Sequence, residues 1–278
     1  MKVFKHSIIA AATALLLGIS GPVSAEDGPY PVWWAPVLEL DSLDAIDARL
    51  ERKLWEGDSK GMPLIKHEGD NYDSDTWVEA WADSCNALMT LTAAGYYGGG
   101  SPAIWAQHYH LSQCKAINML SRAAPARVSF VRDLSFDLES VNYLPAMVDL
   151  SPSCDFICRE VVANERRIPL SHFHDIRLIQ ILSQTEMKYW SEDWQIRLVS
   201  LAHADFTQDG VEDMLVLSSG GSISGSGSWA ELFLLTRFGP DEVLQIVNAE
   251  QYLCADYQCR SSYEYPEALK TPLGDGPQ

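Results

Sequence analysis

Basic residues are scarce in this chain. It has 20 lysine and arginine residues against 38 aspartate and glutamate residues, which gives a formal net charge of -18 over 278 residues. Attraction to nucleic acid or to an anionic membrane surface depends on clustered lysine and arginine side chains. The composition therefore argues against both kinds of partner, whereas a basic or secreted protein would be tolerated as a partner. The alternative is that the negative charge only keeps an exported protein soluble.

Long apolar runs are also missing, except near the N-terminus. Residues 1–25 begin with two lysines, continue with the apolar stretch from Ile8 to Ile19, and end in small residues at Ala25. This arrangement is typical of a secretory signal peptide. Nothing downstream approaches the run of about 18 apolar residues that a membrane-spanning helix needs. We therefore predict a periplasmic or secreted protein that is not inserted in a membrane after signal cleavage.

The motifs of several large enzyme classes are absent. The sequence contains no H-E-x-x-H zinc motif, no G-x-S-x-G nucleophile motif and no Walker loop. The Gly/Ser-rich stretch 220–228 superficially fits a dinucleotide-binding fingerprint, but a predicted strand follows it where that fingerprint requires a helix. We interpret 220–228 as a hairpin loop. Pairs of catalytic carboxylates leave no local motif, so an enzyme is not excluded.

All six cysteines follow the predicted signal peptide. An even number of cysteines in an exported chain indicates disulfides. Structural zinc is the rival use, but the cysteines lack the paired C-x-x-C spacing that such sites usually show. We favour pairing between nearest neighbours, which gives Cys85–Cys114, Cys154–Cys158 and Cys254–Cys259.

Hydrophobic periodicity predicts an α+β fold in two parts. Helical spacing recurs over 42–54, 75–92 and 101–123, whereas 56–74 is polar and is predicted to be a loop. Alternation with a period of two dominates after about residue 124. We therefore predict a mainly helical part over 26–165 and a β-rich part over 166–278, built on a mainly antiparallel sheet. The predicted strands cover 128–138, 176–182, 195–202, 214–218, 229–238 and 243–247.

One acidic stretch, Asp205-Phe-Thr-Gln-Asp-Gly-Val-Glu-Asp213, has the spacing of a cation-binding loop. Oxygen-bearing side chains stand at loop positions 1, 3, 5 and 9, and glycine at position 6 permits a left-handed backbone. The glutamate that closes an EF-hand at position 12 is missing. The predicted calcium ligands are the side chains of Asp205, Thr207, Asp209 and Asp213 and the carbonyl oxygen of Val211.

This stretch resembles the D-x-[DN]-x-D-G-x-x-D loops of the FG-GAP and VCBS repeat families. The resemblance covers residues 205–213 only, and Thr207 stands where those families have aspartate or asparagine. It implies a structural calcium site that leads directly into a β-strand. The alternative is an acidic turn between two strands, whose carboxylates accept hydrogen bonds from backbone amides and bind no metal.

A second candidate site lies at His172, His174 and Asp175. On a strand, alternate residues would place both imidazoles on one face with a carboxylate beside them. That arrangement would suit metal or general-base chemistry. The sequence therefore leaves two main functions open, with a purely structural envelope protein as a third. The first is an exported non-catalytic binding protein of the inhibitor or toxin-immunity type, with a structural calcium site. The alternative is a hydrolase of envelope polymers that uses the His/carboxylate cluster.

Overall fold

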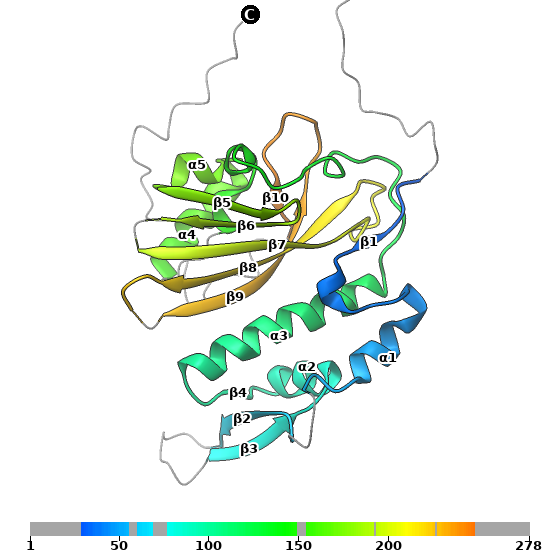
Figure 1. Cartoon of the computed structure of the whole chain (residues 1–278), viewed down its shortest axis with the longest axis vertical. Coiled ribbons are helices and arrows are strands. Elements are labelled where there is room, and N and C mark those ends of the chain that lie inside the picture. Colours follow the sequence, from blue (N-terminus) through cyan, green and yellow to red (C-terminus); the bar gives the residue numbers. More distant parts are fainter. Residues whose placement is uncertain are drawn as a thin grey trace, which may run out of the picture.

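A computed structural model describes residues 29–55, 60–68, 77–148, 154–191, 193–225 and 227–247 of the chain. Its largest element is an antiparallel sheet in which strands that follow one another in sequence lie side by side, in the order β10-β9-β8-β7-β6-β5 (Figure 1). The short strand β1 pairs with the last residues of β7. The strands are β1 (Trp33–Trp34), β5 (Leu178–Ser183), β6 (Glu186–Trp190), β7 (Trp194–Ala204), β8 (Asp213–Ser222), β9 (Ser228–Thr236) and β10 (Gln245–Ile246).

Both faces of this sheet are buried at its centre. In β8, Leu215 and Leu217 belong to one apolar cluster, whereas Met214 and Val216 belong to a second cluster. Successive side chains of a strand point to opposite faces, so the four residues reach both sides of the sheet. The uninterrupted apolar run of this strand follows from that double burial.

Helices cover the two faces. The long helix α3 (Ser101–Leu120) packs along β9 and β8, with α1 (Ile46–Glu51) and α2 (Cys85–Ala93) on its far side (Figure 1). The other face is covered by α4 (Cys154–Glu165), by α5 (Leu170–Phe173) and by two 3-10 turns at Ser140–Asn142 and Ala146–Val148. Two further 3-10 turns, at Pro36–Leu38 and Leu43–Ala45, precede α1.

The mixed α+β class is confirmed, but the helical ordering predicted for the N-terminal part is not supported, because that part also contains a sheet. A second antiparallel sheet, in the order β3-β2-β4, is formed by β2 (Met62–His67), β3 (Trp77–Ala82) and β4 (Tyr97–Gly98). The predicted loop 56–74 contains β2, and residues 77–82 of the predicted helix 75–92 form β3. That helix starts only after Ser84, whose side chain accepts a hydrogen bond from the amide of Ala87 at 3.3 Å. Pairing between β2 and β3 buries Leu64, and this long-range contact overrides the helical spacing.

The strands predicted after residue 170 are confirmed as β5, β7, β8, β9 and β10, with shifted ends. The predicted strand 128–138 is wrong. In this segment only Val128 forms a bridge, with Val211, and the chain then turns repeatedly. The interpretation of 220–228 as a loop is wrong at both ends, because β8 continues to Ser222 and β9 begins at Ser228. No helix in the described part of the chain is long and apolar enough to cross a membrane.

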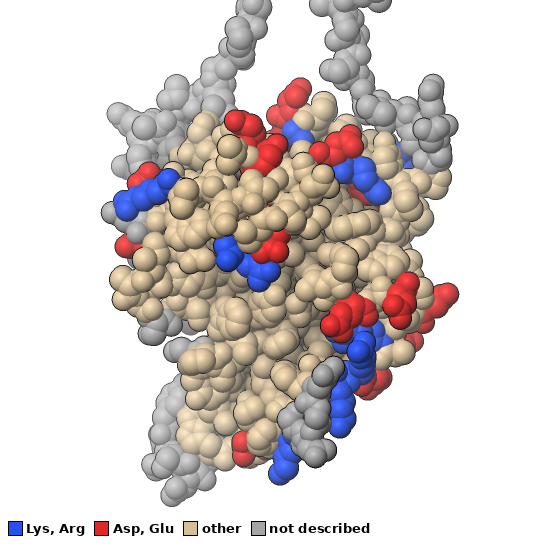
Figure 2. Space-filling model, viewed as in Figure 1, with Lys and Arg blue, Asp and Glu red and all other residues tan. Residues whose placement is uncertain are grey.

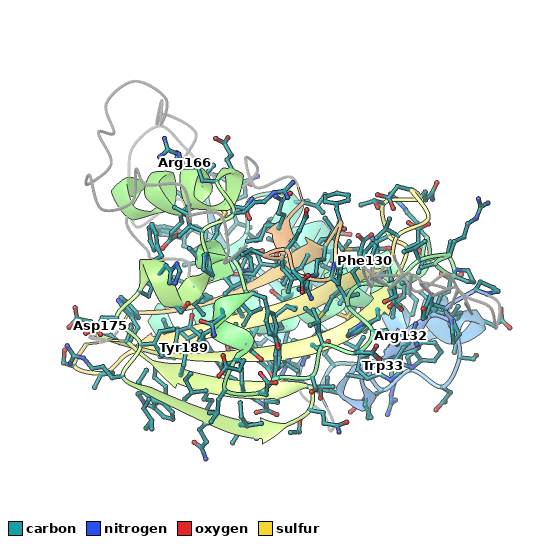
Figure 3. The ribbon with its side chains drawn as sticks, turned by 90° about the horizontal axis from the view of Figure 1, so that it is seen from above. Trp33, Phe130, Arg132, Arg166, Asp175 and Tyr189 are labelled. Atoms are coloured by element: carbon teal, nitrogen blue, oxygen red, sulfur yellow. A yellow bond between two sulfur atoms is a disulfide. The ribbon has the colours of Figure 1, made fainter. Side chains whose placement is uncertain are left out.

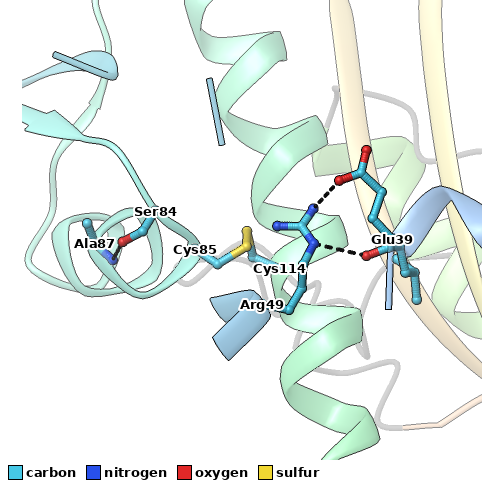
Figure 4. The surroundings of a disulfide bond; sticks show 7 residues. Glu39, Arg49, Ser84, Cys85, Ala87 and Cys114 are labelled. Atoms are coloured by element: carbon cyan, nitrogen blue, oxygen red, sulfur yellow. Dashed lines mark hydrogen bonds and ion pairs between the residues drawn. A yellow bond between two sulfur atoms is a disulfide. The ribbon is translucent and has the colours of Figure 1, made fainter. Parts of the chain in front are cut away.

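The Cys85–Cys114 disulfide is confirmed and joins α2 to α3 (Figure 4). The two Cα atoms are 5.2 Å apart, and both cysteines are fully buried at the seam between the helices. A disulfide is consistent with an exported protein. The side chains of Cys154 and Cys158, together with the whole of the Cys254 and Cys259 pair, fall outside the described residues.

We expect the double variant Cys85→Ala/Cys114→Ala to fold with lower stability. The bond spans 29 positions, and the loop-entropy relation gives a loss of about 3 to 4 kcal/mol in the free energy of unfolding. Urea unfolding of the wild type and of the variant measures this difference. A loss below about 1 kcal/mol would show that the α2–α3 seam holds without its cross-link.

Candidate functional site

The acidic loop 205–213 forms a tight turn between β7 and β8. Gly210 has a φ of 89°, which is the left-handed conformation predicted for it. The two carboxylate oxygens of Asp205 accept hydrogen bonds from the backbone amides of Asp209 and Gly210, at 3.1 and 2.8 Å. One carboxylate oxygen of Asp213 accepts hydrogen bonds from the backbone amides of Phe206 and Thr207, at 3.0 and 3.1 Å. These hydrogen bonds are those of the acidic-turn alternative.

Within the residues that the structure describes, no three His, Cys, Asp or Glu side chains are grouped as metal ligands. Asp213 is fully buried, and burial raises the pKa of its carboxyl group. A carboxylate oxygen that accepts one amide retains a further lone pair. Calcium binding at this loop stays a prediction.

The same loop is hydrogen-bonded to residues 127–132, which are distant from it in the sequence. The carbonyl of Gly210 accepts hydrogen bonds from the amides of Arg127 and Val128 at 2.8 and 3.1 Å. The fully buried Glu212 accepts a hydrogen bond from Ser129 and binds both Nε and Nη2 of Arg132. Breaking such a buried ion pair on one side leaves an uncompensated charge, which is costly. The loop therefore fixes where Arg132 lies.

Arg132 lines a pocket of about 390 Å³ at the end of β7, together with Trp33 and His203. Figure 3 shows Arg132 beside Trp33. His203 Nε2 lies 2.9 Å from Ser200 Oγ, and its ring meets the ring of Trp33 edge to face at 5.1 Å. Burial, with the nearby charge of Arg132 as a smaller cause, lowers the pKa of His203 from 6.5 to about 4.

Ser200 and His203 meet because β7 is irregular. Residues three apart on a regular strand point to opposite faces, but the register of β7 against β8 shifts between Ser200 and Ala202. His203 Nδ1 has no hydrogen-bond partner in the described part of the chain. A catalytic Ser–His pair uses a third group on that nitrogen to orient the imidazole. The pair therefore lacks a feature of the familiar hydrolytic triad.

The second candidate cluster is not assembled as predicted. His172 lies in the short helix α5, and His174 follows its end, so the two imidazoles do not alternate along a strand. Asp175 is exposed and forms an ion pair with Arg177 at 3.4 Å. Figure 3 places Asp175 at the opposite end of the sheet from Arg132. The expected His/carboxylate site on one strand face is therefore wrong.

A larger groove, of about 950 Å³, opens between the start of α3 and the sheet. This volume lies within the range of small-molecule sites, about 300 to 1,000 Å³. Trp105 of α3 and Trp190 of β6 both line it, and Trp105 is stacked on Tyr109 with ring centroids 5.2 Å apart. Sequence periodicity did not indicate the groove, because its lining comes from five separate stretches. The lining residues are Pro102, Trp105, Ala106, Lys188, Trp190, Gln195, Arg197, Ser219, Gly220, Gly221, Ser222, Ile223 and Ser228.

The groove floor is formed by the Ser-Gly-Gly-Ser end of β8. At Gly220 an added Cβ would lie 2.6 Å from the ring of Trp229, so this glycine allows the tryptophan to pack against the backbone. At Gly221 an added Cβ would meet only the carbonyl oxygen of Gly227, at 3.9 Å. A side chain at Gly221 therefore has room. Because glycine has no side chain, the space above Gly221 at the groove floor stays empty.

Two cations line the groove. Lys188 of β6 stands directly opposite Arg197 of β7 in the strand register. Arg197 donates to Glu186 at 2.7 Å, and this hydrogen bond raises the pKa of its guanidinium group. Like charges on directly opposite residues destabilise a sheet. The carboxylate of Glu186 offsets part of the repulsion between Lys188 and Arg197. An anionic group bound in the groove would offset the rest.

The acidic excess does not form one continuous patch on the face shown in Figure 2. Among the described residues on that face, acidic and basic side chains stand in small groups with uncharged surface between them. A uniformly acidic surface for a basic partner is therefore not seen there. Comparison of the chain with protein-family models, with curated proteins and with solved structures found no match.

The calcium prediction is tested by melting the mature protein with calcium and with chelator. Because an ion that binds only the folded state stabilises it, a hundredfold excess over the dissociation constant should add about 2.7 kcal/mol. We expect the melting temperature to rise with calcium, and Asp209→Ala to abolish the rise. Identical melting curves in calcium and in chelator would leave 205–213 as an acidic turn.

The buried His203 predicts a loss of stability in acid. Its folded-state pKa lies below the unfolded value, so its contribution is present above about pH 6.5 and is lost as the pH falls towards 4. A shift of this size corresponds to about 3 kcal/mol. Urea unfolding at pH 7 and pH 4.5 should therefore show a smaller drop for His203→Gln than for the wild type. Equal drops would contradict this role.

Proposed function

We propose that the protein is an exported, non-catalytic binding protein of the inhibitor or toxin-immunity type, and that the groove between α3 and the sheet is its ligand site. The observation that carries the proposal is the chemistry of the groove lining. Tryptophan rings, hydroxyl groups and cations line it, with no histidine, cysteine or carboxylate among the described lining residues. Such groups bind by stacking, hydrogen bonding and charge, whereas acid–base catalysis uses a titratable pair.

The groove favours a particular kind of contact with the partner. Lys188 and Arg197 suit an anionic group, and Trp105 and Trp190 suit an apolar or aromatic body beside it. We propose that a secreted partner protein inserts a segment that carries an aspartate or glutamate. A basic surface elsewhere on that partner would face the acidic remainder of this chain. The proposed location is the periplasm or the extracellular space.

The alternative, an envelope-polymer hydrolase, has weaker support. Its nominated residues, His172, His174 and Asp175, belong to a short helix and the loop after it rather than to one strand face. The Ser200–His203 pair is buried and lacks a partner on Nδ1 within the described chain. A structural calcium ion at 205–213 stays part of the proposal, and the melting experiment above tests it separately.

The proposal is tested by capturing partners from the exported fraction of the native cells on immobilised mature protein. We expect Trp105→Ala, Trp190→Ala and Gly221→Leu each to weaken retention of the partner by about tenfold or more, since buried tryptophan contacts dominate many interfaces. Gly221→Leu fills the floor where a side chain has room. Each variant should melt close to the wild type.

The matched control is Trp81→Ala. Trp81 is 42% exposed and Trp105 is 37% exposed, but Trp81 lies on the small sheet away from the groove. It should retain the partner like the wild type. Retention that is unchanged in all three groove variants would show that the groove is not the site. Shortening of a polymer during incubation with the protein would favour the hydrolase.

A further inference from the structure

Strand β5 forms an exposed edge of the large sheet. Within the described residues its only strand partner is β6, and Figure 1 shows it at the end of the meander. Leu178, Ile181 and Leu182 are exposed by 57%, 37% and 41%. An edge strand offers unpaired backbone groups to another chain, and natural proteins usually protect such an edge with charge or proline. This strand contains neither.

The sequence of the strand is a palindrome, Leu178-Ile179-Gln180-Ile181-Leu182. When two copies of one strand pair antiparallel about a two-fold axis at the central residue, each position meets the position equally far on the other side of the centre. Here that register places leucine opposite leucine, isoleucine opposite isoleucine, and Gln180 opposite Gln180. Every apolar side chain thus meets an apolar side chain.

We propose that a second copy of this chain pairs with β5 in that register and forms a symmetric dimer. Backbone hydrogen bonds and the apolar cross-strand pairs would supply the affinity. A β-bulge between Ile181 and Ser183 bends one end of the strand, so the three central residues carry the pairing. A partner of unrelated sequence would match this palindrome only by chance.

The charge distribution also favours this strand for a contact between copies. Each chain has a net charge of -18, so most faces of two copies repel each other. Residues 178–183 carry no charge, and Arg177 beside them is paired with Asp175 at 3.4 Å. The neutral strand lets two acidic chains approach. Since salt screens the remaining repulsion, the dimer should strengthen as ionic strength rises.

The dimer would place two grooves on one side of the assembly. The two-fold axis between antiparallel strands is perpendicular to their sheet, so both copies turn the same face of the sheet outward. The groove opens on the α3 face, next to β6 and therefore close to β5. Two grooves on one face could then engage two segments of a partner at once.

Charge substitutions at Gln180 test the register. Gln180→Lys and Gln180→Glu each place like charges opposite one another at the axis, so each variant alone should dimerise at least about tenfold more weakly than the wild type. An equal mixture of the two should regain the dimer, because opposite charges then meet. Sedimentation velocity at physiological salt measures the dimer fraction. The same substitutions at the exposed Ser183 are the matched control and should leave dimerisation unchanged.

A cysteine at the same position gives a second readout. In Gln180→Cys the paired Cα atoms would lie about 4.5 to 5.5 Å apart, within reach of a disulfide. In Ser183→Cys the two cysteines would lie roughly 20 Å apart, because six positions separate the residues that would meet. We expect a cross-linked dimer only for Gln180→Cys. A wild type that stays monomeric at high micromolar concentration, or a dimer that both charge variants retain, would overturn the proposal.

Discussion

Burial of both faces of the β7–β8 pair is the constraint on which the other elements depend. Met214 and Val216 are buried on one face of the sheet, and Leu215 and Leu217 are buried on the other. Because burial of apolar side chains stabilises the fold, both faces need other elements packed against them. The helix α3 supplies one cover, and the segment that contains α4 and α5 supplies the other. The disulfide fixes α2 against α3, and the acidic turn fixes the segment around Arg132 beside the sheet.

The groove lies at the end of β8 where the side chains are no longer large and apolar. Along β8 the side chains change from leucine and valine to serine and glycine, and the sheet there no longer requires an apolar partner. The start of α3 still passes above it, so space remains between helix and sheet. Gly220 serves packing on one face, whereas Gly221 keeps the floor open on the other. The opposed cations Lys188 and Arg197 add a local electrostatic cost that a bound anion would offset.

Local sequence signals were sufficient where local physics decides the structure. The helical period predicted α3, the period of two predicted β8 and β9, and nearest-neighbour pairing of the cysteines predicted Cys85–Cys114. The strands β2 and β3 were missed because their pairing, not their own periodicity, fixes them. Two further features could not be predicted from local sequence, because they depend on how distant segments pair and pack. These are the bulge that brings Ser200 next to His203 and the placement of Trp105 and Trp190 in one groove. The expected His172–Asp175 site failed for a different reason, because Leu170–Phe173 forms a helix where a strand was expected.

The claim that the groove is the binding site is tested most directly by amide chemical shifts of isotope-labelled mature protein, recorded during titration with the captured partner. The account predicts that the amides of Gly220, Gly221 and Ser222, with those of Lys188 and Trp190, shift or broaden in proportion to binding. Amides of 170–175 should stay unchanged apart from effects of overall size. Changes confined to 170–175, or to the pocket around His203, with the β8 glycines unmoved, would contradict it.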